Sequence, residues 1–256
     1  MSDWLRTPLG QYLLAWEREY LRAAVTDVFG FHALQLGLPD LDVLGANRMP
    51  HRWVALDRVP TASSELACQF SALPFPEQSL DLVVLPHTLE LDADPHGVLR
   101  EVARVLVPEG RVVISGFNPM SLWGQAQKRA RLYQRLGFGR SFLPSEVNAL
   151  GYWRLRDWLR LLNLELDSPN SHFGCFRPAM RSQVWLDRFG FADRMGKRWW
   201  PILGSVYMLV AVKRVHGMTL HSPLRTAKPR VGAAPVSVAN RAHRRARDAR
   251  SGKEAA

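Results

Sequence analysis

Cysteine is scarce in this sequence, and long apolar runs are absent. The 256 residues include two cysteines, Cys68 and Cys175, without the paired spacing of a zinc site or a disulfide framework. We therefore expect two reduced thiols in the protein interior. No stretch reaches the roughly 18 consecutive apolar residues of a membrane span, and the N-terminus lacks the apolar core and cleavage site of a secretory signal. These absences predict a cytoplasmic protein without a membrane span.

Short catalytic signatures are missing as well. The chain contains no nucleophile elbow, HExxH, P-loop or EF-hand spacing. Its eight histidines are scattered, and only His216 and His221 come close together in the sequence. We therefore predict no metal site, and the sequence assigns no catalytic residue.

Positive charge is concentrated at one end of the chain. The net charge is +11, and the segment from Gly217 to Ala256 contains nine Lys or Arg and two Asp or Glu, so it carries +7 of that charge. This segment is rich in Pro, Ser, Ala and Arg without periodicity, which predicts a disordered basic tail over 217–256. Such a tail either contacts an anion (RNA, DNA, a ribosome or an acidic membrane surface) or serves solubility alone.

The first half of the chain alternates between helical and strand patterns. Thr7-Pro8 has the form of an N-cap followed by proline and opens an amphipathic helix that ends near Gly30. Asp94-Pro95 opens another helix in the same way. Short apolar runs bounded by turn residues predict five strands, at 32–38, 52–57, 66–72, 81–87 and 110–118. The β-α-β order favours a parallel sheet with right-handed crossovers.

Further elements are expected after residue 118. We predict helices over 121–136, 154–162 and 178–194, and strands over 164–167 and 205–213. Aromatic and basic residues alternate within 118–151; this pattern suits stacking on bases, or a helix with an apolar inner face and a solvated outer one. We interpret Arg198-Trp199-Trp200-Pro201 as core or edge packing before the last strand, with a membrane-surface role as the alternative.

The stretch from Ser71 to Gly116 contains the most informative pattern. It reads SALPFPEQSLDLVVLPHTLELDADPHGVLREVARVLVPEGRVVISG. This stretch closely resembles the S-adenosylmethionine-dependent methyltransferases of the type 11 group. Their pattern combines an ALPF turn, an FDLVV-like strand, a helix opened by DP and continued as LREVxRVLxPGG, and a further strand. The resemblance extends more weakly over residues 30–214.

The resemblance implies the class I methyltransferase fold, an α/β Rossmann-like three-layer sandwich. Its sheet is mostly parallel and seven-stranded, with an antiparallel last strand. The implied domain spans 1–216, with an N-terminal helix in 1–30 and a lid-like insertion at 118–151. Its cofactor would be S-adenosylmethionine, bound where the strand order reverses, and its methyl acceptor a small molecule or RNA. The oligomeric state does not follow from this resemblance.

The same resemblance names candidates for the cofactor site. Asp57, which ends the second strand, would accept hydrogen bonds from the ribose hydroxyls, or else it caps a turn. Gln69 stands near the expected adenine amine, where its amide oxygen can accept a hydrogen bond. Ala72 and Leu73 of the ALPF turn would pack against the adenine and offer backbone groups to it. His87, at the end of the fourth strand, either lines the site or is a hydrogen-bonded structural residue.

The glycine-rich loop after the first strand departs from the family pattern of an acid, one residue and GxGxG. Gln35 stands in place of the acid, and Gly37, the remaining cofactor-site candidate, is the first glycine. Pro39 and Leu41 replace the other two glycines; proline removes an N–H donor, and leucine adds bulk where the backbone should approach the cofactor. Either the loop is re-routed and still binds S-adenosylmethionine, or the protein is a non-catalytic relative that binds nucleic acid or a ribosome through its basic tail.

Overall fold

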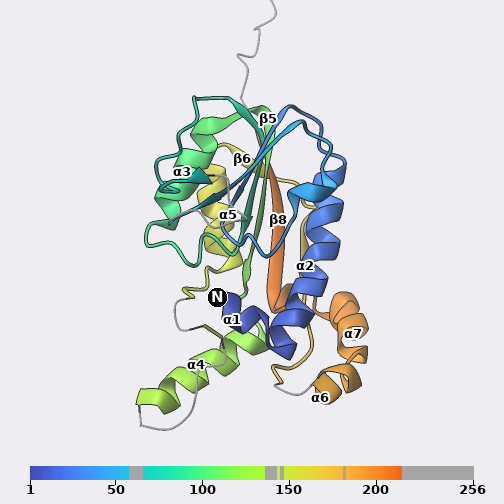
Figure 1. Cartoon of the computed structure of the whole chain (residues 1–256). Helices are drawn as coiled ribbons and strands as arrows, with labels where there is room; N and C mark the ends of the chain where they lie inside the picture. Colours follow the sequence, from blue (N-terminus) through green and yellow to red (C-terminus); the bar gives the residue numbers. More distant parts are fainter. Residues whose placement is uncertain (58–65, 136–142, 145–146, 181–182, 215–256) are drawn as a thin grey trace, which may run out of the picture. The chain divides into compact units, whose positions relative to one another are not determined.

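The computed structural model of the chain describes residues 1–57, 66–135, 143–144, 147–180 and 183–214 (Figure 1). The chain divides into two units, Met1–Val215 and His216–Ala256. The basic tail predicted over 217–256 lies outside the described residues, so its disorder and its contacts stay predictions. Among the described helices, none is both long enough and apolar enough to cross a membrane.

Eight strands form one mixed sheet in the order β3-β2-β1-β4-β5-β8-β6, and β7 also pairs with β8. The strands β1 to β5 run parallel to one another, whereas β8 runs antiparallel to β5 and β6. This topology confirms the predicted class I α/β architecture with an antiparallel last strand. The strands are β1 (His32–Leu36), β2 (His51–Leu56), β3 (Leu66–Ala67), β4 (Leu80–Pro86), β5 (Leu106–Phe117), β6 (Leu164–Leu166), β7 (His172–Gly174) and β8 (Val206–Lys213).

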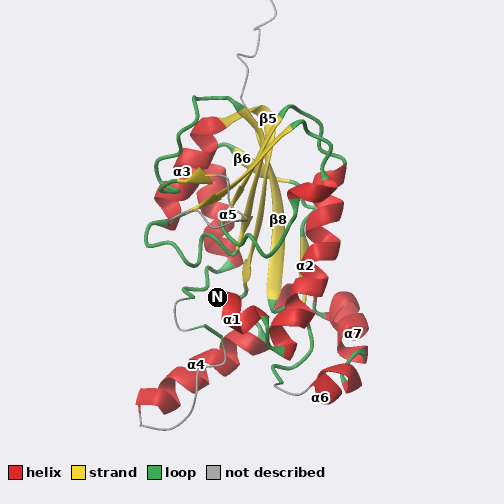
Figure 2. Ribbon diagram, viewed as in Figure 1, coloured by secondary structure: helices red, strands yellow, loops and turns green. Residues whose placement is uncertain are grey.

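Strand β4 shows why the central strands are continuously apolar. Leu82 and Val84 belong to the core on one face of the sheet, and Val83 and Leu85 belong to the core on the other. Helix α2 (Pro8–Thr26) covers the first face, and α3 (Pro95–Val105) and α5 (Tyr152–Leu161) cover the second (Figure 2). A strand covered on both faces needs apolar residues at every position, because neither side meets water.

The sheet contains eight strands rather than the seven implied by the resemblance. Strands β6 and β7 follow one another along the same partner, with Leu166 opposite Ala211 and His172 opposite Met208. Between them, the N–H of Asp167 donates to the carbonyl oxygen of Val210 over 2.8 Å. The N–H of Val210 donates to the Ser171 hydroxyl over 3.1 Å. One edge of the sheet is therefore formed by two short strands, of which β7 was not predicted.

The two helices with predicted caps begin where the caps stand. The Thr7 side chain accepts a hydrogen bond from the N–H of Gly10, and Asp94 accepts one from Gly97. Helix α2 ends at Thr26 and not at Gly30, and β5 begins at Leu106, four residues before the predicted strand. The predicted strand 66–72 is wrong beyond Ala67, because the chain turns there.

The single helix predicted over 178–194 is also wrong. Two helices occupy this region, α6 (Gln183–Arg188) and α7 (Phe191–Trp199), with Gly190 between them. Glycine weakens a helix because its backbone loses the most conformational freedom on folding. The remaining elements are α1 (Ser2–Leu5), α4 (Leu122–Arg135) and two short 3₁₀ helices, η1 (Leu44–Ala46) and η2 (Pro201–Leu203).

One end of the sheet gathers several helices. The parallel strands point their carboxyl ends toward α1, α4, α6 and α7 (Figure 1). The register agrees, because Phe117 at the end of β5 lies opposite Val206, the first residue of β8, which follows η2. In open α/β sheets, ligands bind at this end.

Candidate cofactor site

A cleft of about 580 Å³ opens at the carboxyl ends of β1, β2 and β4. It lies at the point where the strand order reverses, because β1 has β2 on one side and β4 on the other. The described residues that line it come from the strand ends and the segments after them: Met1, Gly37, Leu38, Pro39, Leu56, Asp57, Phe70, Pro86, Thr88, Leu91 and Asp92. The cleft therefore includes Gly37 and Asp57 among the six predicted cofactor-binding residues.

The loop after β1 is built on two consecutive residues in the left-handed backbone region. Gly37 has a φ of 78° and Leu38 a φ of 44°. A Cβ added to Gly37 would lie 3.4 Å from the Thr88 hydroxyl oxygen, so space does not exclude a side chain. The positive φ does favour glycine, since other residues pay a steric cost in this region.

The side chain of Gln35 holds this loop through hydrogen bonds to its backbone. Its side chain is buried, and its amide nitrogen lies 3.2, 3.0 and 2.9 Å from the carbonyl oxygens of Gly37, Leu38 and Leu41. Its amide oxygen accepts a hydrogen bond from the N–H of Val43. An ionised acid at this position has no hydrogen to donate to the three carbonyls. Glutamine therefore suits the loop path found here, in place of the acid of the family pattern.

The two residues that replace the later glycines have different surroundings. Leu41 is fully buried and packs in the core against α2, away from the cleft. Pro39 is half-buried and lines the cleft. Leu41 is not among the described residues that line the cleft.

Carboxylates set the charge of the cleft. Asp57 is exposed directly after β2, and Asp92 lies beyond the end of β4. No Lys or Arg stands among the described lining residues. Two carboxylates without a neighbouring side-chain cation suit a ligand that brings hydroxyl donors and positive charge of its own.

The ALPF turn packs against α3 instead of into the cleft. The N–H of Leu73 donates to a carboxylate oxygen of Glu101 over 2.9 Å, and its carbonyl oxygen accepts from Arg104 over 3.3 Å. Glu101 and Arg104 also form an ion pair of 2.6 Å. They are two of the three charged residues of the LREVxR pattern, so that pattern and the ALPF turn bind one another.

Four of the six predicted residues therefore lie outside the cleft lining: Gln69, Ala72, Leu73 and His87. Gln69 and Ala72 are exposed, and the N–H of Ala72 donates to the carbonyl oxygen of Gln69 over 3.1 Å. Leu73 is buried and its N–H and carbonyl are engaged with α3. Phe70, between Gln69 and Leu73, supplies the lining of this side of the cleft instead.

His87 lies beneath the cleft, fully buried between two carboxylates. Its Nε2 is 2.8 Å from a carboxylate oxygen of Glu17 in α2, and its Nδ1 pairs with Glu90. The ring N–H is poorly aligned with Glu17, whose oxygens accept no hydrogen bond from the described residues, so that contact is ionic. Burial lowers the pKa of His87, but the two carboxylates outweigh burial and raise the pKa to about 10. This position favours the structural interpretation of His87.

Two residues at this site were missed by the sequence analysis. Thr88 donates its hydroxyl hydrogen to the carbonyl oxygen of Leu36 and so ties the end of β4 to β1. Glu17 follows Leu13 by four residues and precedes Leu21 by four, so it stands on the buried face of α2. A lone acid inside that apolar stripe was the available signal for a buried ionic partner.

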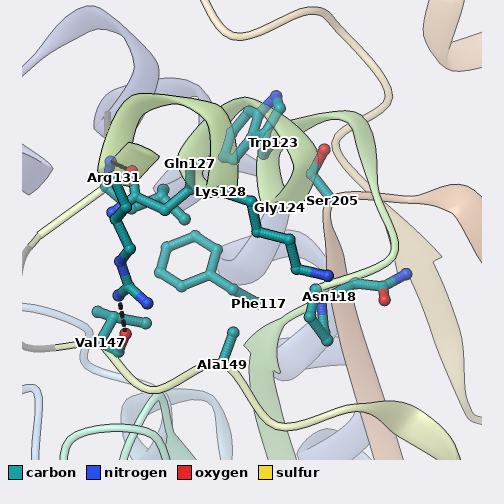
Figure 3. Close-up of a pocket in the computed structure, with 12 residues that line it drawn as sticks. Phe117, Asn118, Trp123, Gly124, Gln127, Lys128, Arg131, Val147, Ala149 and Ser205 are labelled. Atoms are coloured by element: carbon teal, nitrogen blue, oxygen red, sulfur yellow. Dashed lines mark hydrogen bonds between the residues drawn. The ribbon is translucent and has the colours of Figure 1, made fainter. Parts of the chain in front are cut away.

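A second, smaller pocket of about 120 Å³ lies under α4 (Figure 3). Phe117 at the end of β5 and Trp123 of α4 give it aromatic walls, and Lys128 and Arg131 add cationic groups. Arg131 donates to the carbonyl oxygen of Val147 over 2.9 Å. Much of this lining belongs to the predicted lid-like segment 118–151, of which residues 136–142 and 145–146 lie outside the described residues. The pocket can hold a small group with apolar faces.

Helix α1 stands at the boundary of the cleft and the smaller pocket. Met1 lines the cleft. Trp4 packs against the rings of Phe117 and Trp123, at 5.6 and 6.4 Å between ring centroids. In the described part of the chain, no group of three or more His, Cys, Asp or Glu side chains could hold a metal ion; His216 and His221 lie outside it.

Comparisons with known proteins agree with this geometry. Residues 39–114 match the family described as a methyltransferase domain. The chain is similar to the protein YafS of Escherichia coli (strain K12), with 32% identity over 237 residues that cover 89% of this chain and 88% of YafS.

Solved structures of S-adenosylmethionine-dependent methyltransferases share the fold. The Thermotoga maritima protein has 12% identity and a TM-score of 0.55, covering 79% of this chain and 92% of that chain. The Archaeoglobus fulgidus protein has 14% identity and a TM-score of 0.52, covering 79% and 94%. The chain thus belongs to the family of YafS, and it has the fold of the class I methyltransferases.

Proposed function

We propose that this protein binds S-adenosylmethionine in the cleft at the ends of β1, β2 and β4 and transfers its methyl group to a small molecule or to RNA. The observation that carries this proposal is the cleft itself. It is open at the switch point of the sheet, although two of the three loop glycines are missing.

The residues of the cleft fit the cofactor chemically. The exposed Asp57 carboxylate can accept hydrogen bonds from the ribose hydroxyls, and Asp92 adds negative charge that suits a cationic ligand. Leu56 and Phe70 offer apolar surface to the adenine, and the Gly37 backbone allows close approach. We therefore name Gly37 and Asp57 as cofactor-binding residues.

In methyl transfer, the main contribution of the protein is to position the cofactor and the acceptor. Bound S-adenosylmethionine supplies a methyl group that its sulfonium already activates. The chain contributes orientation and exclusion of water, which account for most of the barrier reduction in such reactions. His87 does not serve as a base, since it is buried and holds its proton between Glu17 and Glu90.

The smaller pocket supports an acceptor with a small reactive group. Its aromatic walls suit an apolar or planar group, and Lys128 and Arg131 suit an acceptor that carries negative charge nearby. Both a small anionic molecule and an RNA base have these properties.

Titration calorimetry of the full chain tests cofactor binding directly. We expect saturable binding of S-adenosylmethionine and S-adenosylhomocysteine at one site per chain, with a dissociation constant in the micromolar range. The protein is first shown to be folded by circular dichroism. Absence of heat at high micromolar ligand would reject the proposal in favour of a non-catalytic relative.

Transfer is tested with cofactor carrying a radiolabelled methyl group. The protein is incubated with separate small-molecule and RNA fractions of a cell extract, and the label is followed into each fraction. Label in one fraction identifies the acceptor class. Cofactor binding without label in either fraction would show that the chain binds S-adenosylmethionine but is not a methyltransferase for these classes.

A further inference from the structure

Six large apolar side chains are exposed within a short segment before β8. The tryptophans are the most exposed of them, Trp199 at 66% and Trp200 at 59%. Both tryptophans therefore lie outside the core, and the interpretation of this segment as core packing is wrong for them. The other four are also exposed: Phe191, Met195, Ile202 and Leu203. We call these six residues, together with Arg194 and Arg198, the α7–η2 surface.

The opposite face of α7 is fixed to the body of the protein. Asp193 accepts hydrogen bonds from Arg177 over 2.8 Å and from the hydroxyl of Tyr12. Gly196 lies so close to Phe176 that an added Cβ would be 2.3 Å from its ring. Lys197 donates to the Tyr20 hydroxyl over 2.7 Å. Because these contacts hold the inner face, the α7–η2 surface is presented outward.

Helical spacing places the exposed residues of α7 together. At about 100° per residue, Phe191, Met195 and Trp199 fall within a sector of roughly 80°, and Arg194 and Arg198 lie along one side of it. Both arginines are exposed, and neither forms an ion pair with a described residue. The segment thus combines an apolar stripe with unneutralised positive charge.

We propose that the α7–η2 surface docks on an anionic phospholipid surface. Indole rings are amphipathic and prefer the level of lipid headgroups. Guanidinium groups bind phosphate in a bidentate manner. A short helix with an apolar stripe beside basic residues lies in the plane of such an interface. The proposal does not depend on methyl transfer, because none of these residues lines the cleft.

Two other occupants match the surface less well. A second copy related by a twofold axis would bring the same patch, with Arg194 and Arg198, against itself, and like charges would oppose each other. Single-stranded RNA would stack on the tryptophans, but it offers no counterpart to the aliphatic groups of Met195, Ile202 and Leu203. A lipid surface satisfies both the apolar and the cationic side chains.

Docking would also orient the cleft. The α7–η2 surface lies at the same end of the sheet as the carboxyl ends of β1, β2 and β4 (Figure 1). A bilayer bound there faces the end of the molecule where the cofactor cleft opens.

Vesicle co-sedimentation of the full chain tests the proposal. Vesicles of phosphatidylcholine alone are compared with vesicles of phosphatidylcholine and phosphatidylglycerol, and we expect binding to the anionic vesicles. The double variant Arg194→Glu/Arg198→Glu should bind them at least about thirtyfold more weakly, because each lost basic residue near the surface is worth about 1 kcal/mol and each new carboxylate adds repulsion. The single variant Trp199→Ala should bind about tenfold more weakly through lost apolar contact.

Matched control variants make the same kind of change at other positions and keep the basic tail unaltered. Arg18→Glu/Arg22→Glu reverses two exposed arginines of α2 with the same spacing and the same change in net charge. Trp153→Ala removes a tryptophan of α5 that is 54% exposed. Both controls should bind anionic vesicles as the unaltered chain does, and circular dichroism checks that all variants are folded.

Three results would overturn the proposal. The first is equal binding by the variants and their controls, or equal binding to neutral and anionic vesicles. The second is loss of binding to a labelled single-stranded RNA in the same variants while vesicle binding is unchanged. The third is a dimer, detected by analytical ultracentrifugation, that Trp199→Ala dissociates while vesicle binding is unchanged.

Discussion

The side-chain amide nitrogen of Gln35 lies 2.9 Å from the carbonyl oxygen of Leu41, across the loop that follows β1. This contact turns the chain back after Pro39 and directs the Leu41 side chain into the core. The cleft stays open because the bulk that replaces a glycine points away from it. A degenerate glycine motif is thus compatible with an open cleft at the switch point of the sheet.

Replacing Gln35 by glutamate should destabilise the protein. A buried carboxylate would face the carbonyl oxygens of Gly37, Leu38 and Leu41 without a hydrogen to donate, which costs about 2–4 kcal/mol. Urea unfolding measures the loss, and the loss should shrink at low pH, where the new carboxyl group binds a proton. The exposed Gln69→Glu serves as the control, with a change within about 0.5 kcal/mol. Equal stability of the two variants would contradict this role of Gln35.

Asp57→Ala should weaken cofactor binding without unfolding the chain. The lost charge-assisted hydrogen bonds amount to about 1–3 kcal/mol of binding free energy, measured by titration calorimetry with S-adenosylhomocysteine. Asp40→Ala is the matched control, since Asp40 is an exposed acid in the loop after β1 but is not among the described lining residues. An unchanged affinity of the Asp57 variant would remove Asp57 from the site.

The buried histidine predicts how stability depends on pH. The pKa of His87 is raised from 6.5 to about 10 in the folded protein. Its stabilising contribution is therefore complete below about pH 6.5, and it is lost as the pH rises toward 10. Over this window the free energy of unfolding should fall by at most about 1.4 kcal/mol per pH unit from this group. Urea unfolding from pH 6 upward provides the measurement.

Glu17→Gln isolates this contribution. With one carboxylate removed, the pKa of His87 rises less, so the decline of stability with pH should become shallower. Glu19→Gln, an exposed acid on the same helix, should keep the slope of the unaltered chain. If both variants show the same slope, Glu17 does not hold the proton on His87.

Local patterns predicted most of the fold. The run Leu82 to Leu85 specified a strand buried on both faces, and Thr7 and Asp94 marked the starts of α2 and α3 because their caps act within three residues. The errors occurred where neighbours distant in the sequence decide the structure. Strand β7 forms by pairing with the edge of β8, which lies more than thirty residues further along the chain. Gly190 lies between α6 and α7, in a segment whose apolar pattern continues on both sides of it.

The cleft residues that directly follow a strand could be predicted from the sequence. Gly37 and Asp57 follow β1 and β2, and parallel strands bring their ends together. The ion pair of Glu17 with His87 was not predictable, because seventy residues separate the two in the sequence. No local pattern around either residue indicates which residue it contacts. Exposure of Trp199 and Trp200 could not be inferred either, since the sequence gives no sign of what covers a tryptophan.

The short outer strands have a consequence for how the protein behaves at high concentration. The outermost strands are β3, with two residues, on one side, and β6 and β7, with three residues each, on the other. In the described part of the chain, a neighbouring molecule at the β6 and β7 edge therefore meets no long row of unpaired backbone groups onto which it could add a strand. The interrupted border thus protects a sheet whose central strands are almost wholly apolar from growing into intermolecular aggregates.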